Sequence, residues 1–252
     1  MILKKLPLLL IAWCLPVAGP AQSSDAPVPL QIRAVLHDPV HPTADLFLTD
    51  KTGGVVKLKL VPEGFSEVQS ALLVNGSLIL YRSASVDPKN LMANLAASVK
   101  IPPSTKRAML IILPAPAESK PVDGKPAESN PSYRIVLIDD SPKAFPKGES
   151  RVLPLITVEA AIEAGEHKLP IHPGVITNVP AVRKVNPYNM AQTNFYFKQG
   201  GAWVTFVERQ LQFLDAYRRV FIVHVTPGAT QPEVTTILDT APAVINTAPP
   251  KH

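Results

Sequence analysis

Apolar residues along the chain form short runs that proline and glycine interrupt. In the run 54–61, Lys57 and Lys59 alternate with Leu58 and Leu60, so successive side chains point to opposite faces of an extended chain. Runs of this kind, rich in Val, Ile, Leu, Phe and Tyr, predict β-strands. They lie at 30–36, 54–61, 77–82, 108–113, 133–138, 151–158, 202–208, 219–225 and 233–239. Their spacing predicts an all-β protein rather than one of alternating strands and helices.

Helical periodicity is scarce. The best candidate is 87–99, where Asp87 could cap a helix and Pro88 is tolerated in its first turn. An alternative makes 98–101 a strand, so we expect helix only over the first two turns. The segment 207–219 fits a strand and turn better than a helix. We therefore expect few or no helices beyond the signal peptide.

Several segments recur in the same order along the chain. Segments 107–116 and 219–228 both consist of an arginine, an apolar run and a proline. The matched pairs are 56–64 with 167–174, 77–82 with 202–209, 107–116 with 219–228 and 134–142 with 234–242. Agreement in element order indicates two related modules. We predict two immunoglobulin-like β-sandwich modules in tandem, at 28–142 and 148–242, with a flexible Pro-rich loop at 115–132 and a disordered tail at 243–252.

Two adjacent aspartates, Asp139 and Asp140, end one of the apolar runs and could form a catalytic or metal-binding pair. The alignment of the repeats places Asp139 over Asp239 and Pro142 over Pro242, whereas Asp140 has no acidic counterpart. One aspartate followed by a proline is what a turn needs, because the carboxylate accepts a backbone N–H bond and proline fixes φ. The repeat therefore predicts a structural turn at both positions.

The segment YRIVLIDDSPKAFPKGESRVLPL, at 133–155, resembles secreted bacterial β-rich proteins that carry a similar Asp-Asp-Ser, Phe-Pro-x-Gly and Arg-Val pattern and have no assigned activity. The resemblance covers 98–242. It implies an envelope or secreted β-protein and brings no catalytic residue with it.

The N-terminus has the three parts of a secretory signal peptide, which we expect to end near residue 21. Lys4 and Lys5 precede an apolar segment shorter than the roughly 20 residues that span a bilayer. Trp13 stands where a lipoprotein signal has a small residue, which argues against a lipid anchor at Cys14. Because Cys14 is the only cysteine, the mature chain has no disulfide, thiolate metal site or cysteine nucleophile. We predict export to the periplasm or beyond, and no membrane span in the mature chain.

The formal net charge is +5, and the basic residues are scattered singly along the sequence. Proteins that bind nucleic acid concentrate basic residues on one face. We therefore expect no nucleic acid partner and instead an envelope protein or polysaccharide.

Two further groups of residues could carry chemistry. His37, Asp38 and His41 are metal-ligand types, but prolines keep their segment extended, which separates the histidines by about 13 Å. We therefore predict no metal site and no cofactor. Aromatic residues crowd 195–203, where alternation favours a hairpin whose rings fill the second module's core, with Tyr196 pointing the opposite way.

The sequence favours an exported, non-enzymatic β-sandwich protein that acts as a binding or structural component of the bacterial cell envelope. One alternative is a secreted hydrolase or metal-dependent enzyme that uses Asp139 and Asp140 or the His37–His41 loop. The other is a carbohydrate-binding module, which requires Tyr196 and Trp203 to be exposed on one flat face.

Overall fold

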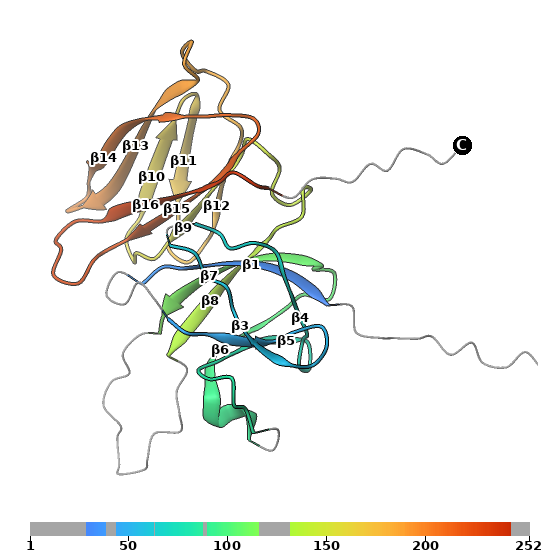
Figure 1. Cartoon of the computed structure of the whole chain (residues 1–252). Helices are drawn as coiled ribbons and strands as arrows, with labels where there is room; N and C mark the ends of the chain where they lie inside the picture. Colours follow the sequence, from blue (N-terminus) through green and yellow to red (C-terminus); the bar gives the residue numbers. More distant parts are fainter. Residues whose placement is uncertain (1–28, 39–43, 63, 88–89, 116–131, 243–252) are drawn as a thin grey trace, which may run out of the picture.

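A computed structural model describes residues 29–38, 44–62, 64–87, 90–115 and 132–242. The predicted signal peptide, Cys14, His41, most of the predicted loop and the predicted tail lie outside these residues. Within them the protein is all-β, with strands in two similar halves that are stacked on one another (Figure 1). No helix in this part of the chain has the length and apolar composition needed to cross a membrane.

Each half contributes eight strands. In the N-terminal half these are β1 (Leu30–Leu36), β2 (Phe47–Thr49), β3 (Val55–Lys57), β4 (Gln69–Ala71), β5 (Ser77–Tyr81), β6 (Leu95–Lys100), β7 (Arg107–Pro114) and β8 (Tyr133–Asp139). In the C-terminal half they are β9 (Ser150–Pro154), β10 (Ala160–Ala164), β11 (His167–Ile171), β12 (Thr177–Val179), β13 (Met190–Gln199), β14 (Ala202–Gln212), β15 (Arg218–His224) and β16 (Glu233–Asp239).

The strand order is the same in both halves. One pair of sheets has the orders β4-β1-β7-β8 and β12-β9-β15-β16, and the other has β3-β2-β5-β6 and β11-β10-β13-β14. In each half the first strand runs parallel to the seventh, and the seventh is antiparallel to the eighth. The repeat inferred from the sequence is thus present in the sheet arrangement. The order differs from that of immunoglobulin domains, in which strands A, B, E and D form one sheet and C, F and G the other.

Three apolar cores hold the four sheets together. One lies between the two sheets of the N-terminal half and another between those of the C-terminal half. The third joins the halves, because it combines residues of β1, β7 and β8 with residues of β9, β15 and β16. Along β7, Leu110 and Ile112 face the first core, whereas Met109 and Ile111 face the third. A strand buried on both faces explains why β7 and β15 are continuous apolar runs in the sequence.

Three predictions about these elements were wrong. The run 54–61 is a strand only at Val55–Lys57. Where two helical turns were expected at the start of 87–99, the described residues form a 3-10 helix at Leu91–Asn94 that leads directly into β6. The alignment also matched 77–82 with 202–209, but the counterpart of β5 is β13, since each is the third strand in its four-stranded sheet. The mismatch arose because β6 was partly assigned to a helix and β13 was not among the predicted strands, so that β5 and β14 each became the last strand before the one that begins with arginine.

Candidate functional site

Asp139 and Asp140 have different surroundings although they are adjacent. The exposed carboxylate of Asp139 accepts a hydrogen bond from the backbone N–H of Ser141 at 2.8 Å. Asp239 accepts a similar bond from the backbone N–H of Ala241 at 3.3 Å. The carboxylates of Asp139 and Asp239 therefore each stabilise a turn. Asp140 differs, because it is 1% exposed and points between the two halves.

Asp140 belongs to a buried cluster of two arginines and two aspartates. Arg33 on β1 bonds Asp140 through Nη2 at 2.9 Å and Asp239 through Nη1 at 2.7 Å. Arg218, at the start of β15, contacts both carboxylates as well. Each half thus supplies one buried arginine and one buried aspartate, and the partly exposed Arg107 of β7 also lies 3.6 Å from Asp140. This interface cluster, defined as Arg33, Asp140, Arg218 and Asp239, bridges the halves.

The cluster corrects the alignment of the repeat by one residue. Ile138 pairs with Met109 and Ile237 pairs with Val220, and all four side chains lie in the third core. Counting onward from Ile138 and Ile237 makes Asp140, not Asp139, the counterpart of Asp239. A shift of one residue reverses the face to which every side chain of a strand points. The alignment of identical residues therefore paired Asp239 with the outward-facing Asp139 instead of the inward-facing Asp140.

The electrostatics of the interface cluster favour a structural role. Burial lowers the pKa of Arg33, but its hydrogen bonds to Asp239 and Asp140 outweigh burial and raise the pKa above the usual value. Burial raises the pKa of Asp239, but the bonds and charges of Arg33 and Arg218 lower it overall. The Asp239 carboxylate therefore stays ionised, and the arginines occupy its oxygens, so it is poorly placed to accept a proton from a substrate.

Sequence analysis did not select Arg33 or Arg218. A signal existed, because Arg33 lies between apolar residues of β1, on the same face as Val35, and a buried arginine requires a partner. The partner could not be named from the sequence, since Arg33 and Asp239 are 206 residues apart.

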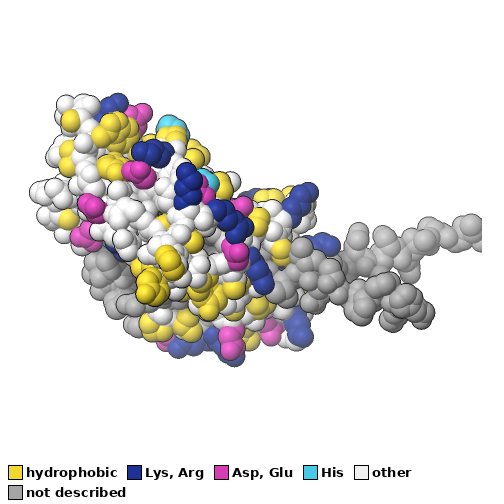
Figure 2. Space-filling view, turned by 90° about the horizontal axis from the view of Figure 1, so that it is seen from above, with side chains coloured by type: hydrophobic (Ala, Val, Ile, Leu, Met, Phe, Trp, Pro, Cys, Tyr) yellow, Lys and Arg dark blue, Asp and Glu magenta, His cyan; other side chains and the backbone are white. Residues whose placement is uncertain are grey.

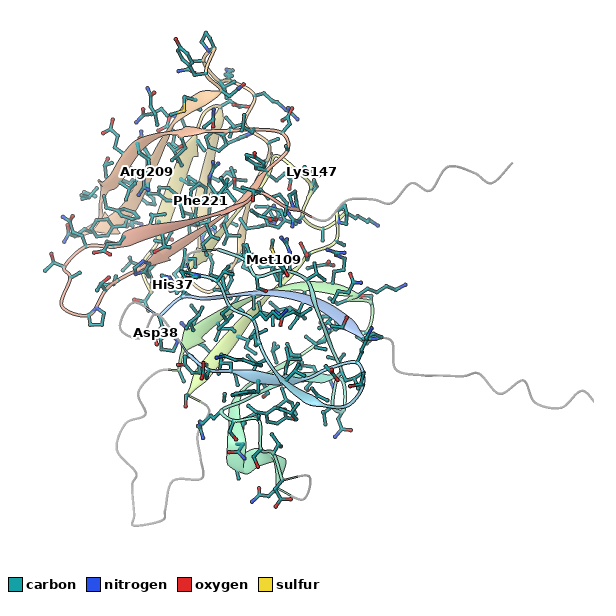
Figure 3. The ribbon with its side chains drawn as sticks, viewed as in Figure 1. His37, Asp38, Met109, Lys147, Arg209 and Phe221 are labelled. Atoms are coloured by element: carbon teal, nitrogen blue, oxygen red, sulfur yellow. The ribbon has the colours of Figure 1, made fainter. Side chains whose placement is uncertain are left out.

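His37 and Asp38 lie where β1 leaves the sheet, at the junction of the halves (Figure 3). The ring of His37 packs edge-on against His224 of β15, with 4.7 Å between ring centroids. Burial and the nearby His224 lower the pKa of His37 to about 4, although Asp38 opposes the shift. No group of three or more His, Cys, Asp or Glu side chains among the described residues is arranged to hold a metal ion.

Tyr196 and Trp203, in contrast, line one hollow. It has a volume of about 470 Å³ and lies on the outer face of the sheet β11-β10-β13-β14. Phe195 and Phe197 point inward and are buried, as the alternation predicted. Trp203 was predicted to lie in the core with these rings, but its side chain is on the surface, where the residue is 53% exposed. The outer hollow, as we name it, is lined by Ala161, Ile162, Glu163, Lys168, Leu169, Pro170, Tyr196 and Trp203.

The strand register explains why a hollow forms there. Ala161 on β10 has Pro170 and Tyr196 as its direct neighbours on β11 and β13. A small side chain between two larger ones leaves a depression in the sheet surface. Trp203 of β14 is paired with Lys198, one row further along the sheet. The rings of Tyr196 and Trp203 therefore come from neighbouring strands and border the same space.

Polar contacts fix one wall of the outer hollow. The Tyr196 hydroxyl donates to Glu163 Oε2 at 2.9 Å and accepts from Asn194 Nδ2 at 3.2 Å. Lys168 Nζ lies 2.8 Å from Glu163 Oε1. The hydrogen bonds from Lys168 and Tyr196 lower the pKa of Glu163, so its carboxylate is ionised at neutral pH. The hollow thus combines apolar surface with one carboxylate and the exposed amine that is paired with it.

The exterior also carries basic side chains, and Figure 2 shows several in a row across one face, with acidic side chains beside some of them. Exposed ion pairs such as Arg183 with Asp215 and Lys198 with Glu159 illustrate this mixing. Interleaved acids reduce the attraction of such a row for a polyanion. The outer hollow is therefore the stronger candidate for a ligand site.

Comparison with known proteins adds no assignment: no family model matches the chain, and no curated protein matches its sequence.

Proposed function

We propose that the protein is an exported, non-enzymatic component of the bacterial cell envelope that binds carbohydrate in the outer hollow. In this proposal each half is a two-layer β-sandwich domain with an architecture like that of immunoglobulin domains, although the strand order differs. The C-terminal domain carries the ligand, and the N-terminal domain supports it through the shared core and the interface cluster.

The placement of Tyr196 and Trp203 in one hollow is the observation that carries the proposal. A sugar ring has a face of C–H groups that packs on an aromatic ring, and a rim of hydroxyls that needs hydrogen-bonding partners. Trp203 offers an exposed ring, while Glu163 and Lys168 offer an acceptor and a donor at the edge of the same space. Apolar surface with a few oriented polar groups is the usual composition of a small-molecule site.

The residues considered for the enzyme alternative support a non-catalytic protein instead. Asp139 is engaged in a turn, and Asp140 lies under two arginines in the interface cluster. A paired-carboxylate mechanism needs both groups to face one substrate. The export part of the proposal rests on the signal-peptide pattern at 1–21.

Binding to polysaccharides tests the proposal directly. The protein lacking residues 1–21 should be retained on at least one of cellulose, chitin or purified peptidoglycan sacculi. Trp203→Ala should weaken retention about five- to tenfold, because loss of one stacking ring costs about 1–1.5 kcal/mol. Ala161→Leu should also weaken it, since the larger side chain fills the depression.

Tyr188→Ala is the matched control, because Tyr188 is 76% exposed and lies outside the outer hollow. It should bind as the unaltered protein does. Absence of retention on all three polysaccharides would contradict the proposed function. Equal retention of the Trp203→Ala, Ala161→Leu and Tyr188→Ala variants would show that carbohydrate binds outside the outer hollow, which would also contradict the proposal.

A further inference from the structure

The outer hollow is asymmetric, and the asymmetry bears on which sugar it accepts. Across the sheet, Pro170, Ala161 and Tyr196 form an apolar row. In the neighbouring row, Lys168 is paired with Glu163. An apolar floor therefore lies directly beside one hydrogen-bond acceptor and one donor.

We infer, resting on the proposed function, that the outer hollow selects N-acetylated sugars. An acetamido group consists of an N–H donor, a carbonyl acceptor and a methyl group held in one plane. Glu163 can accept from the N–H, and Lys168 can donate to the carbonyl oxygen. The methyl group can rest on the apolar floor around Ala161, while the sugar ring packs on Trp203.

The same features disfavour the related sugars. A plain hydroxyl in place of the acetamido group could bond to Glu163 or Lys168 but has no methyl group, so it would leave the floor at Ala161 and Pro170 uncovered. A free amino sugar would bring a cation toward Lys168, and a uronic acid would bring a carboxylate toward Glu163. Because Glu163 and Lys168 neutralise each other, a neutral ligand with both a donor and an acceptor suits the site best.

Three oligosaccharides with the same β-1,4 linkage separate these cases in calorimetric titrations. They are the tetramers of N-acetylglucosamine, glucose and glucosamine. The N-acetylated tetramer should bind about tenfold tighter or more than the other two, since a site built around a hydrogen-bonding group rejects analogues that lack it. Glu163→Gln and Lys168→Met should each reduce that preference.

Lys198→Met serves as the control variant, because Lys198 forms a similar exposed ion pair with Glu159 but does not line the outer hollow. It should keep the preference for the N-acetylated tetramer. Equal affinity for the three tetramers, lost on Trp203→Ala, would overturn the acetamido inference and leave carbohydrate binding standing. If no tetramer and no polysaccharide binds, the proposed function itself fails. Circular dichroism of each variant shows that its fold is intact.

Discussion

At the scale of single residues, the pair Asp139 and Asp140 shows how position on a strand decides a role. Asp139 points outward and forms a turn, whereas Asp140 points between the halves and meets two arginines. The alignment of the repeats predicted the turn at Asp139 and gave Asp140 no acidic counterpart. Because alternate residues face opposite sides of a strand, the residue that looked incidental is the one that is buried.

Asp140→Asn should therefore destabilise the protein by about 3–5 kcal/mol, since removing one member of a buried ionic group leaves an uncompensated charge. Asp139→Asn, the adjacent control, should cost less than about 0.5 kcal/mol, because the amide oxygen of asparagine can accept the same bond from the backbone N–H of Ser141. Urea denaturation of both variants measures the difference. A smaller loss for Asp140→Asn than for Asp139→Asn would show that the interface cluster contributes little to stability.

The stability of the fold also depends on the protonation state of His37, and therefore on pH. Its pKa is lowered from 6.5 to about 4 in the folded protein, so protonation favours the unfolded chain. The stabilising effect is present above pH 6.5 and decreases as the pH falls toward 4. Of the neighbouring acids, Asp38 raises the pKa of His37 and Glu233 raises that of His224, but burial dominates for both rings.

The unaltered protein should lose more stability than His37→Gln between about pH 7 and about pH 5, because glutamine does not titrate. His172→Gln, which alters an exposed histidine, should behave like the unaltered protein. The measurement is the urea midpoint of each protein at the two pH values. Identical pH dependence in all three proteins would mean that His37 is not responsible.

At the scale of elements, the turn between β10 and β11 positions one side of the outer hollow. Gly165 adopts φ +54 there, and a Cβ at this position would collide with Val182 Cγ1. A side chain would have to adopt a left-handed conformation and also displace a core residue. The two strands that carry Glu163 and Lys168 therefore depend on a glycine at this turn.

Gly165→Ala should cost about 2–4 kcal/mol, the sum of a left-handed conformation and overpacking. Gly174→Ala is the control, because Gly174 has φ +73 but nothing within 4 Å of its added Cβ. It should cost only about 1–2 kcal/mol, the conformational part. Thermal or urea denaturation compares the two variants, and equal losses would rule out the packing contribution.

What the sequence could predict depended on the length of each strand's pattern. Strands such as β1 and β16 are seven residues long, and their mainly apolar and β-branched residues predicted the observed bounds. Three-residue strands have too few positions to show a period, and β6 was partly assigned to a helix because LAASVK follows helix-compatible residues. Tyr196 was placed by alternation, but Trp203 was not, since its exposure depends on the position of β14 at the sheet edge.

At the scale of the whole molecule, the third core makes the two halves depend on each other. Its residues come from both halves and are almost completely buried, Ile111 and Ile222 being 0% exposed. The interface cluster adds ion pairs between the halves, because Arg33 contacts Asp239 and Arg218 contacts Asp140. Neither half can leave its partner without exposing apolar surface and separating these charges, so we expect them to unfold together.

Ile111→Ala tests this coupling, because the change lies in the N-terminal half while its effect can be read in the other. Removing a buried isoleucine side chain should cost about 2–5 kcal/mol. Trp203 is the only tryptophan in the protein lacking residues 1–21, so its fluorescence reports on the C-terminal half alone. If the halves unfold as one unit, the transition seen by Trp203 should shift to lower urea together with the circular dichroism signal of the whole chain.

Leu80→Ala, in the N-terminal half's own core, should shift both signals in the same way. A Trp203 transition that stays in place in both variants, while circular dichroism shows an earlier loss of strand, would mean that the halves unfold independently.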